Sequence, residues 1–121
     1  MGKFLAKSTP TGVKFDFLNG DQVVLSSEVY KAQQTCLNGI ASIQKNAADA
    51  EIEDQTVEPI VEKKHPKFEI FLDKNKAYRF RFKARNGEII ASSPAFDSKA
   101  AAEAALAVAK KSADDEVEKA F

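Results

Sequence analysis

The chain repeats itself, and this repeat restricts the possible folds more than any single motif does. A stretch that begins KFLAKSTP at Lys3 aligns with one that begins KFEIFLDK at Lys67, and the spacing between matched positions drifts only from 64 to 66 residues. A unit of roughly 50 residues buries too small a share of its surface to be stable alone. We therefore expect the two copies to share one core. The matched pairs are Phe4 with Phe68, Phe15 with Phe80, Val23 with Ile89, Tyr30 with Phe96, Ile40 with Leu106, and Ser26-Ser27 with Ser92-Ser93.

Each copy is predicted to form three strands, a helix and a fourth strand. The segment YRFRFKA in the second copy alternates apolar and basic residues with the period of a half-buried strand. The Asn-Gly steps in FLNGD and RNG favour hairpin turns between strands. The segment KAAAEAALAVAKK lacks glycine and proline and predicts a helix, which Asp97 and Ser98 can cap. The helix expected in the first copy carries Cys36, Ile40 and Ile43 on one apolar stripe.

This pattern predicts an α+β fold of two tandem β-β-β-α-β repeats that share one antiparallel sheet. Both helices are expected on one face of the sheet, which leaves the other face to solvent. We expect a single pseudo-symmetric domain over residues 1–121, with repeat one at residues 2–56 and repeat two at residues 67–121. Residues 57–66 contain Pro59 and Pro66 and are predicted to be a linker.

The charge balance and the apolar segments restrict the partners and the compartment. The 18 basic residues balance the 18 acidic ones, so no overall charge draws the protein to nucleic acid or to an anionic membrane. No segment approaches the roughly 20 apolar residues that span a bilayer. Cys36 is the only cysteine, which excludes an internal disulfide and favours a reducing compartment. We expect a cytoplasmic monomer without membrane attachment, although exposed edge strands could still pair between chains.

Two long segments carry a resemblance to a known family. The stretches GEIIASSPAFDSKAAAEAALAVAKKSA and VVLSSEVYKAQQTCLNGIASIQKNA resemble the repeat of the YegP-like family, small bacterial proteins of unknown function. The shared pattern is an aliphatic pair, Ser-Ser, an aromatic residue and a helix. The resemblance implies that the last strands, near Ala50 to Thr56 and Glu116 to Phe121, are exchanged between the repeats. LAKSTPTG departs from the usual first hairpin, and Pro94 stands where an acidic residue is common.

Residues that could carry chemistry are few, and the family supplies no catalytic or binding residues. His65 lies in the polar segment EKKHPK without a second His or a Cys nearby, and Cys36 falls on the apolar stripe of its helix. The acidic residues beside the two last strands could attract a cation only if the fold brings them together, and they lack the spacing of an EF-hand. We predict no enzyme, no metal and no cofactor. Those acidic residues are Glu51, Glu53, Asp54, Asp114, Asp115 and Glu116.

A basic strand is the best candidate for a binding surface. Its outward side chains would form a patch for phosphates or an acidic partner. The competing interpretation is that Glu69 and Glu88 on neighbouring strands pair with these residues, for about 0.2 to 1 kcal/mol each. The phenylalanines of the strand should point inward. Phe71 of the preceding strand should point outward, either to stack beside Arg79 or Arg81 or to pack under the exchanged final strand. The candidate residues are Lys67, Arg79, Arg81, Lys83 and Arg85.

Three functions from different classes are compatible with the sequence. The favoured one is a non-catalytic interaction module that binds a protein partner through its sheet face or its strand edges. The alternative is a nucleic-acid or anion-binding module that uses the basic strand Arg79–Arg85, whose affinity would fall with salt. The least favoured is an enzyme built from Cys36, His65 or the acidic turns.

Overall fold

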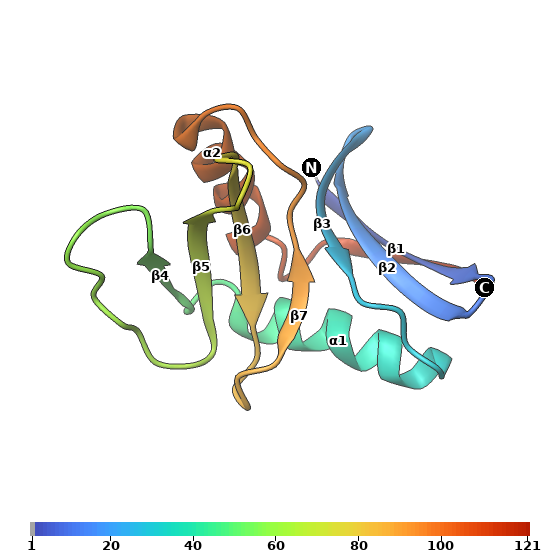
Figure 1. Ribbon diagram of the computed structural model, residues 1–121. Helices are drawn as coiled ribbons and strands as arrows, with labels where there is room; N and C mark the ends of the chain where they lie inside the picture. Colours follow the sequence, from blue (N-terminus) through green and yellow to red (C-terminus); the bar gives the residue numbers. More distant parts are fainter. Residues whose placement is uncertain (1) are drawn as a thin grey trace.

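The computed structural model describes residues 2–121 as an α+β fold with one open sheet of eight strands and two helices (Figure 1). The strands lie in the order β4-β5-β6-β7-β3-β2-β1-β8. The strands are β1 (Gly2–Thr9), β2 (Gly12–Asn19), β3 (Gln22–Ser27), β4 (Glu51–Asp54), β5 (Lys67–Leu72), β6 (Tyr78–Lys83), β7 (Ile89–Ser92) and β8 (Glu116–Ala120), and the helices are α1 (Gln33–Asn46) and α2 (Lys99–Lys110).

Two antiparallel meanders form the centre of the sheet. β1, β2 and β3 make one, and β5, β6 and β7 make the other. Gly20 and Gly87 take positive φ angles of 63° and 85° in the turns that the Asn-Gly steps predict. The meanders join where β3 pairs with β7, and this junction contains only the pairs Ser26–Ser92 and Ser27–Ala91.

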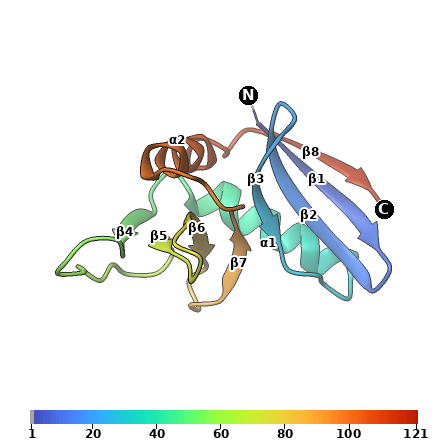
Figure 2. The same cartoon turned by 45° about the horizontal axis from the view of Figure 1, so that its top comes forward.

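The sheet is mixed, so the prediction of a wholly antiparallel sheet is wrong. β8 pairs in parallel with β1, and β4 pairs in parallel with β5 (Figure 2). Each of these strands follows a helix and lies at an end of the sheet, β4 beside the second meander and β8 beside the first. Parallel neighbours cannot be joined by a tight turn. The segment between β4 and β5, residues 55–66, supplies the long return connection and contains no strand or helix.

Both helices pack on the phenylalanine face of the sheet and contribute to one core. The buried side chains of the two meanders and the two helices form a single cluster that holds Phe4, Phe15, Phe17, Phe68, Phe80 and Phe82. Gly39 lets α1 approach the sheet closely, because a Cβ atom there would lie 3.2 Å from the Phe15 ring. Lys110 at the end of α2 lies over the Phe68 ring. None of the helices within residues 2–121 has the length and apolar character needed to cross a membrane.

Candidate binding surfaces

The outward basic side chains of β6 lie on the face opposite the helices, where Arg81 and Lys83 pair with Glu69. Glu69 of β5 stands directly across from Arg81 in the β5–β6 register. Its carboxylate accepts a hydrogen bond from Arg81 Nε at 2.6 Å and lies 3.2 Å from Lys83 Nζ. Only 2% of the Glu69 surface is exposed. This pairing is the one that the competing interpretation of the strand predicted for Glu69.

A second carboxylate extends this cluster toward β4. Lys67 Nζ lies 2.7 Å from Glu53 Oε1 and 3.3 Å from Glu69 Oε2, and all three residues are buried. The backbone N–H of Lys63 and the side chain of Gln55 also donate to Glu53. Residues 55–66 are therefore tied to the outer sheet face. We call Glu53, Lys67, Glu69, Arg81 and Lys83 the outer-face ion cluster.

Hydrogen bonds keep both carboxylates of the cluster ionised. Burial alone would raise the pKa of Glu69, but the bonds from Arg81 and Lys83 outweigh it, and the pKa is lowered. The hydrogen bond from Lys67, which acts against burial, lowers the pKa of Glu53 to about 2. A buried charge that is paired and bonded in this way is stabilised only while its partners remain.

The other candidate residues of the basic strand lie outside the cluster. Arg79 donates from Nε and from a terminal nitrogen to the carbonyl oxygen of Ser93, at 3.1 and 2.9 Å. Arg85 lines a separate hollow of about 300 Å³ together with Lys64 and His65. The Arg81 guanidinium lies 4.3 Å from the centroid of the Phe71 ring, the stacking that the sequence indicated. Binding of an anionic partner by Lys67, Arg79, Arg81, Lys83 and Arg85 stays a prediction.

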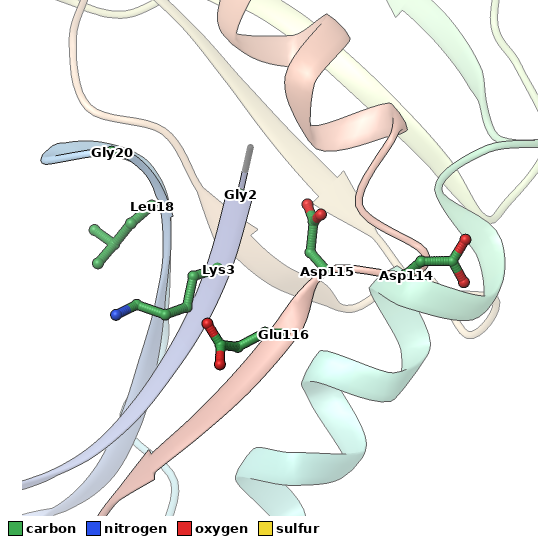
Figure 3. Close-up of a pocket in the computed structure, with 7 residues that line it drawn as sticks. All are labelled: Gly2, Lys3, Leu18, Gly20, Asp114, Asp115 and Glu116. Atoms are coloured by element: carbon green, nitrogen blue, oxygen red, sulfur yellow. The ribbon is translucent and has the colours of Figure 1, made fainter.

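The acidic residues beside the last strands do not form one group. Those of β4 and those near β8 lie at opposite ends of the sheet. Figure 3 shows the side chains of Asp114, Asp115 and Glu116 pointing in different directions around a hollow of about 420 Å³. At the other end, Asp54 pairs with Lys99 at 2.6 Å. Within residues 2–121 no group of three or more His, Cys, Asp or Glu side chains is arranged to hold a metal ion.

Cys36 and His65 occupy separate environments. Cys36 is fully buried in the core, and burial raises the pKa of its thiol, which disfavours the reactive thiolate. His65 lies in the connection before β5, beside Arg85 in the same hollow. A nucleophilic cysteine is activated by an adjacent base, by a lowered pKa or by a metal. The raised pKa of Cys36 is the opposite of the second condition.

The open edge of β8 is a feature that the strand patterns did not single out. β8 pairs with β1 on one side and ends the sheet on the other (Figure 2). All its residues except Val117 are exposed. Lys3 of β1 bonds Glu118 of β8 at 3.0 Å. At the opposite end of the sheet, a connecting segment lies against β4: the Lys63 N–H of residues 55–66 donates to Glu53.

A hollow lies at the junction of the two meanders, and the sequence patterns did not predict it either. It measures about 510 Å³ and is lined by residues 28–30 and 87–90. Glu88 lies there and forms no salt bridge with an arginine of β6 within residues 2–121, so the predicted pairing of Glu88 with these arginines is wrong. The sequence places two large apolar residues, Val29 and Ile89, in the segments that line this hollow.

Comparison with known proteins identifies the family. The model of a domain of unknown function, DUF1508, matches residues 18–54 and 73–118. The chain belongs to this family. A protein of unknown function from E. coli, yegP, has a solution NMR structure that matches 98% of this chain and 91% of its own with a TM-score of 0.76 and 22% identity, which shows a common fold. The resemblance to the YegP-like family is confirmed.

Two relatives in sequence support the assignment to the DUF1508 family. UPF0339 protein PA0329 of Pseudomonas aeruginosa is 31% identical over 93 residues, which are 77% of this chain and 70% of that protein. A UPF0339 protein of Treponema denticola is 47% identical over 49 residues, which are 40% of this chain and 84% of that protein. These descriptions assign no activity to the family.

Proposed function

We propose that this chain is a non-catalytic interaction module that binds an extended segment of a partner protein along the free edge of β8. The observation that carries the proposal is that β8 is exposed and pairs on one side only. An unpaired strand edge offers a row of N–H and C=O groups to an added strand. No chemistry is required of Cys36, His65 or the acidic turns.

The charge of the edge favours a basic partner strand. Glu116, Glu118 and Ala120 of β8 lie in register with Lys3, Leu5 and Lys7 of β1, so the two glutamates share the outer face of the sheet. Opposite charges on neighbouring strands stabilise a pair by about 0.2 to 1 kcal/mol. A partner with lysine or arginine at alternate positions would match both glutamates.

The same charges disfavour pairing of β8 with β8 of a second copy. Two β8 strands from two copies of the chain could pair antiparallel with their sheet faces aligned. If this pair is centred on Glu118, Glu118 of one copy stands opposite Glu118 of the other. A pair centred on Val117 puts Glu116 opposite Glu118, and one centred on Lys119 sets two lysines together. Like charges directly opposite each other are destabilising. The edge therefore favours a different protein over self-association.

The proposal includes an origin of the chain by duplication, with the last strands exchanged between the repeats. The placement of β4 beside β5 and of β8 beside β1 supports the exchange. The Treponema denticola protein supports the duplication, because 49 aligned residues make up 84% of it, close to the length of one repeat here. In this arrangement each repeat takes its edge strand from the other, so the edges of the sheet depend on both.

The test is an NMR titration of the ¹⁵N-labelled protein with a five-residue peptide that alternates lysine and valine. We expect amide shifts at residues 116–120 and weak shifts with the matching glutamate–valine peptide. The double substitution Glu116→Lys and Glu118→Lys should weaken binding of the lysine peptide, while Glu103→Lys on the exposed side of α2 should not. Shifts that avoid β8, or that survive the charge reversal unchanged, would refute the proposal.

A further inference from the structure

The two meanders separate on one side of their short junction. Beyond Ser27, the chain leaves β7, and Tyr30 exchanges two backbone hydrogen bonds with Val13 of β2, at 2.8 and 2.6 Å. On the other wall, Ile89 pairs with Lys83 of β6. The hollow of about 510 Å³ lies between the separated segments and is lined by residues 28–30 and 87–90. We call it the junction groove.

Large apolar side chains are exposed on both walls of the junction groove. Val29 on the first wall is 50% exposed, and Ile89 on the second wall is 38% exposed. Tyr30 and Ile90 are partly buried and complete the lining. Aliphatic side chains on facing walls of a hollow gain free energy when a ligand covers them.

The groove also carries unbalanced negative charge. Glu28 and Glu88 are on opposite walls, and within residues 2–121 neither forms a salt bridge and no lysine or arginine lines the groove. Burial, then the neighbouring Cys36 and these two glutamates, raise the pKa of Tyr30 to about 12. The lining of the groove by Glu28 on one wall and Glu88 on the other is what places both carboxylates there.

We infer that the junction groove binds a lysine or arginine side chain of a partner protein. The aliphatic stem of such a side chain would cover Val29 and Ile89, and its cation would lie between Glu28 and Glu88. The charge excludes the phosphates of a nucleic acid from this site. This inference concerns a site distinct from the β8 edge and holds whether or not that edge binds a strand.

The inference is tested with a peptide of four alanines around one central lysine, acetylated and amidated at its ends, added to the ¹⁵N-labelled protein. The matched control peptide carries the same lysine with its Nζ acetylated, which keeps the stem and removes the charge. We expect the amides of residues 87–90 and 28–30 to shift, with an affinity for the charged peptide about two- to tenfold higher than for the control.

Substitutions then locate the site. The pair Glu28→Gln and Glu88→Gln should remove the difference between the two peptides, whereas Glu103→Gln on α2 should preserve it. Val29→Ser should weaken binding of both peptides. Equal affinity for the two peptides, or no shift at either wall, would overturn the inference. Shifts confined to residues 116–120 would also overturn it, while they would support the proposal for β8.

Discussion

Both halves of the outer sheet face hold buried carboxylates among basic side chains, but on different strands. In the first meander, Asp16 of β2 is held by Lys7 at 2.9 Å, Lys14 at 3.1 Å and the Ser26 hydroxyl at 2.7 Å. In the second, Glu69 of β5 is held by three basic side chains. The first half therefore buries one carboxylate among cations, on β2, and the second half buries two, on β4 and β5.

The difference follows from where each half carries its acidic residues. When the sequences of the two halves are aligned, Asp16 stands opposite Arg81 and Leu5 opposite Glu69, so the buried carboxylates do not correspond. The phenylalanines of the inner face do correspond. Packing against two helices restricts inner positions to apolar residues of similar volume, whereas a carboxylate on the outer face can move to another strand if its partners move with it.

The two halves also differ in whether a connecting segment covers the charges on the outer sheet face. Residues 55–66 are tied to the outer face of the second half through Glu53, and Glu53, Lys67 and Glu69 are each less than 5% exposed. In the first half, the side chain of Lys7, which pairs with Asp16, stays 40% exposed. We therefore expect the second half to depend more strongly on its charges.

The largest effect is expected for removal of the central carboxylate of the second half. Glu69→Ala leaves Arg81, Lys83 and the buried Lys67 without their common partner, and should lower the free energy of unfolding by about 3 kcal/mol. Asp16→Ala in the more exposed first half should cost about 1 to 2 kcal/mol. Urea unfolding followed by circular dichroism measures both. Equal losses would remove the distinction between the halves.

Substitutions of Lys67 and Glu53, the buried pair of the second half, should have coupled effects on the free energy of unfolding. Lys67→Met strands the Glu53 carboxylate and should lower the free energy of unfolding by about 2 to 3 kcal/mol, because an unpaired buried charge is costly. Combined with Glu53→Gln, the loss should be smaller than the sum of the single losses, as a double-mutant cycle measures. Strict additivity would show that the two residues act independently.

Acid should weaken the contact between residues 55–66 and the outer sheet face. The folded protein holds the pKa of Glu53 near 2, below the ordinary value of 4.5, so folding favours the ionised form. That stability is complete above about pH 5 and is lost as the pH falls toward 2. Amide shifts of residues 55–63 during an acid titration report this weakening. Glu53→Gln should remove this part of the pH dependence, and an unchanged titration would contradict the assignment.

The smallest effect is expected at the open edge. Lys3 and Glu118 are both exposed, and solvent and salt screen an exposed ion pair. Glu118→Gln should therefore lower the free energy of unfolding by less than Asp16→Ala does. The midpoint of urea unfolding checks this order. A loss as large as that of Glu69→Ala would mean that the edge contributes as much to the free energy of unfolding as the outer-face ion cluster does.

Much of the fold could be predicted from the sequence because the relevant signals are local. Alternation in YRFRFKA, Asn-Gly turns and an alanine-rich segment after Ser98 each indicate an element, and the structure has β6, the turns at Gly20 and Gly87, and α2 in those places. The parallel pairing of β4 with β5 and of β8 with β1 could not be predicted in this way. It depends on where each helix delivers the chain, which short-range patterns do not contain.

The candidate site was harder to predict than the fold. Lys67 is the first residue after a polar segment and has the sequence context of a surface lysine, yet it is only 3% exposed. Its burial requires Glu53 from a distant strand and cover from residues 55–66. The pairing of Glu69 with Arg81 was predictable, because neighbouring strands in one hairpin place these residues opposite each other.

The central claim is that the protein binds a partner through the β8 edge and that the charges of β6 stabilise the sheet. The most direct test adds the lysine–valine peptide and a short single-stranded oligonucleotide to separate portions of one ¹⁵N-labelled sample. We predict peptide-induced shifts at residues 116–120 and no oligonucleotide-induced shifts at residues 79–85. Shifts at residues 79–85 that fade between about 50 and 200 mM salt would contradict the claim, because they would show β6 binding phosphate.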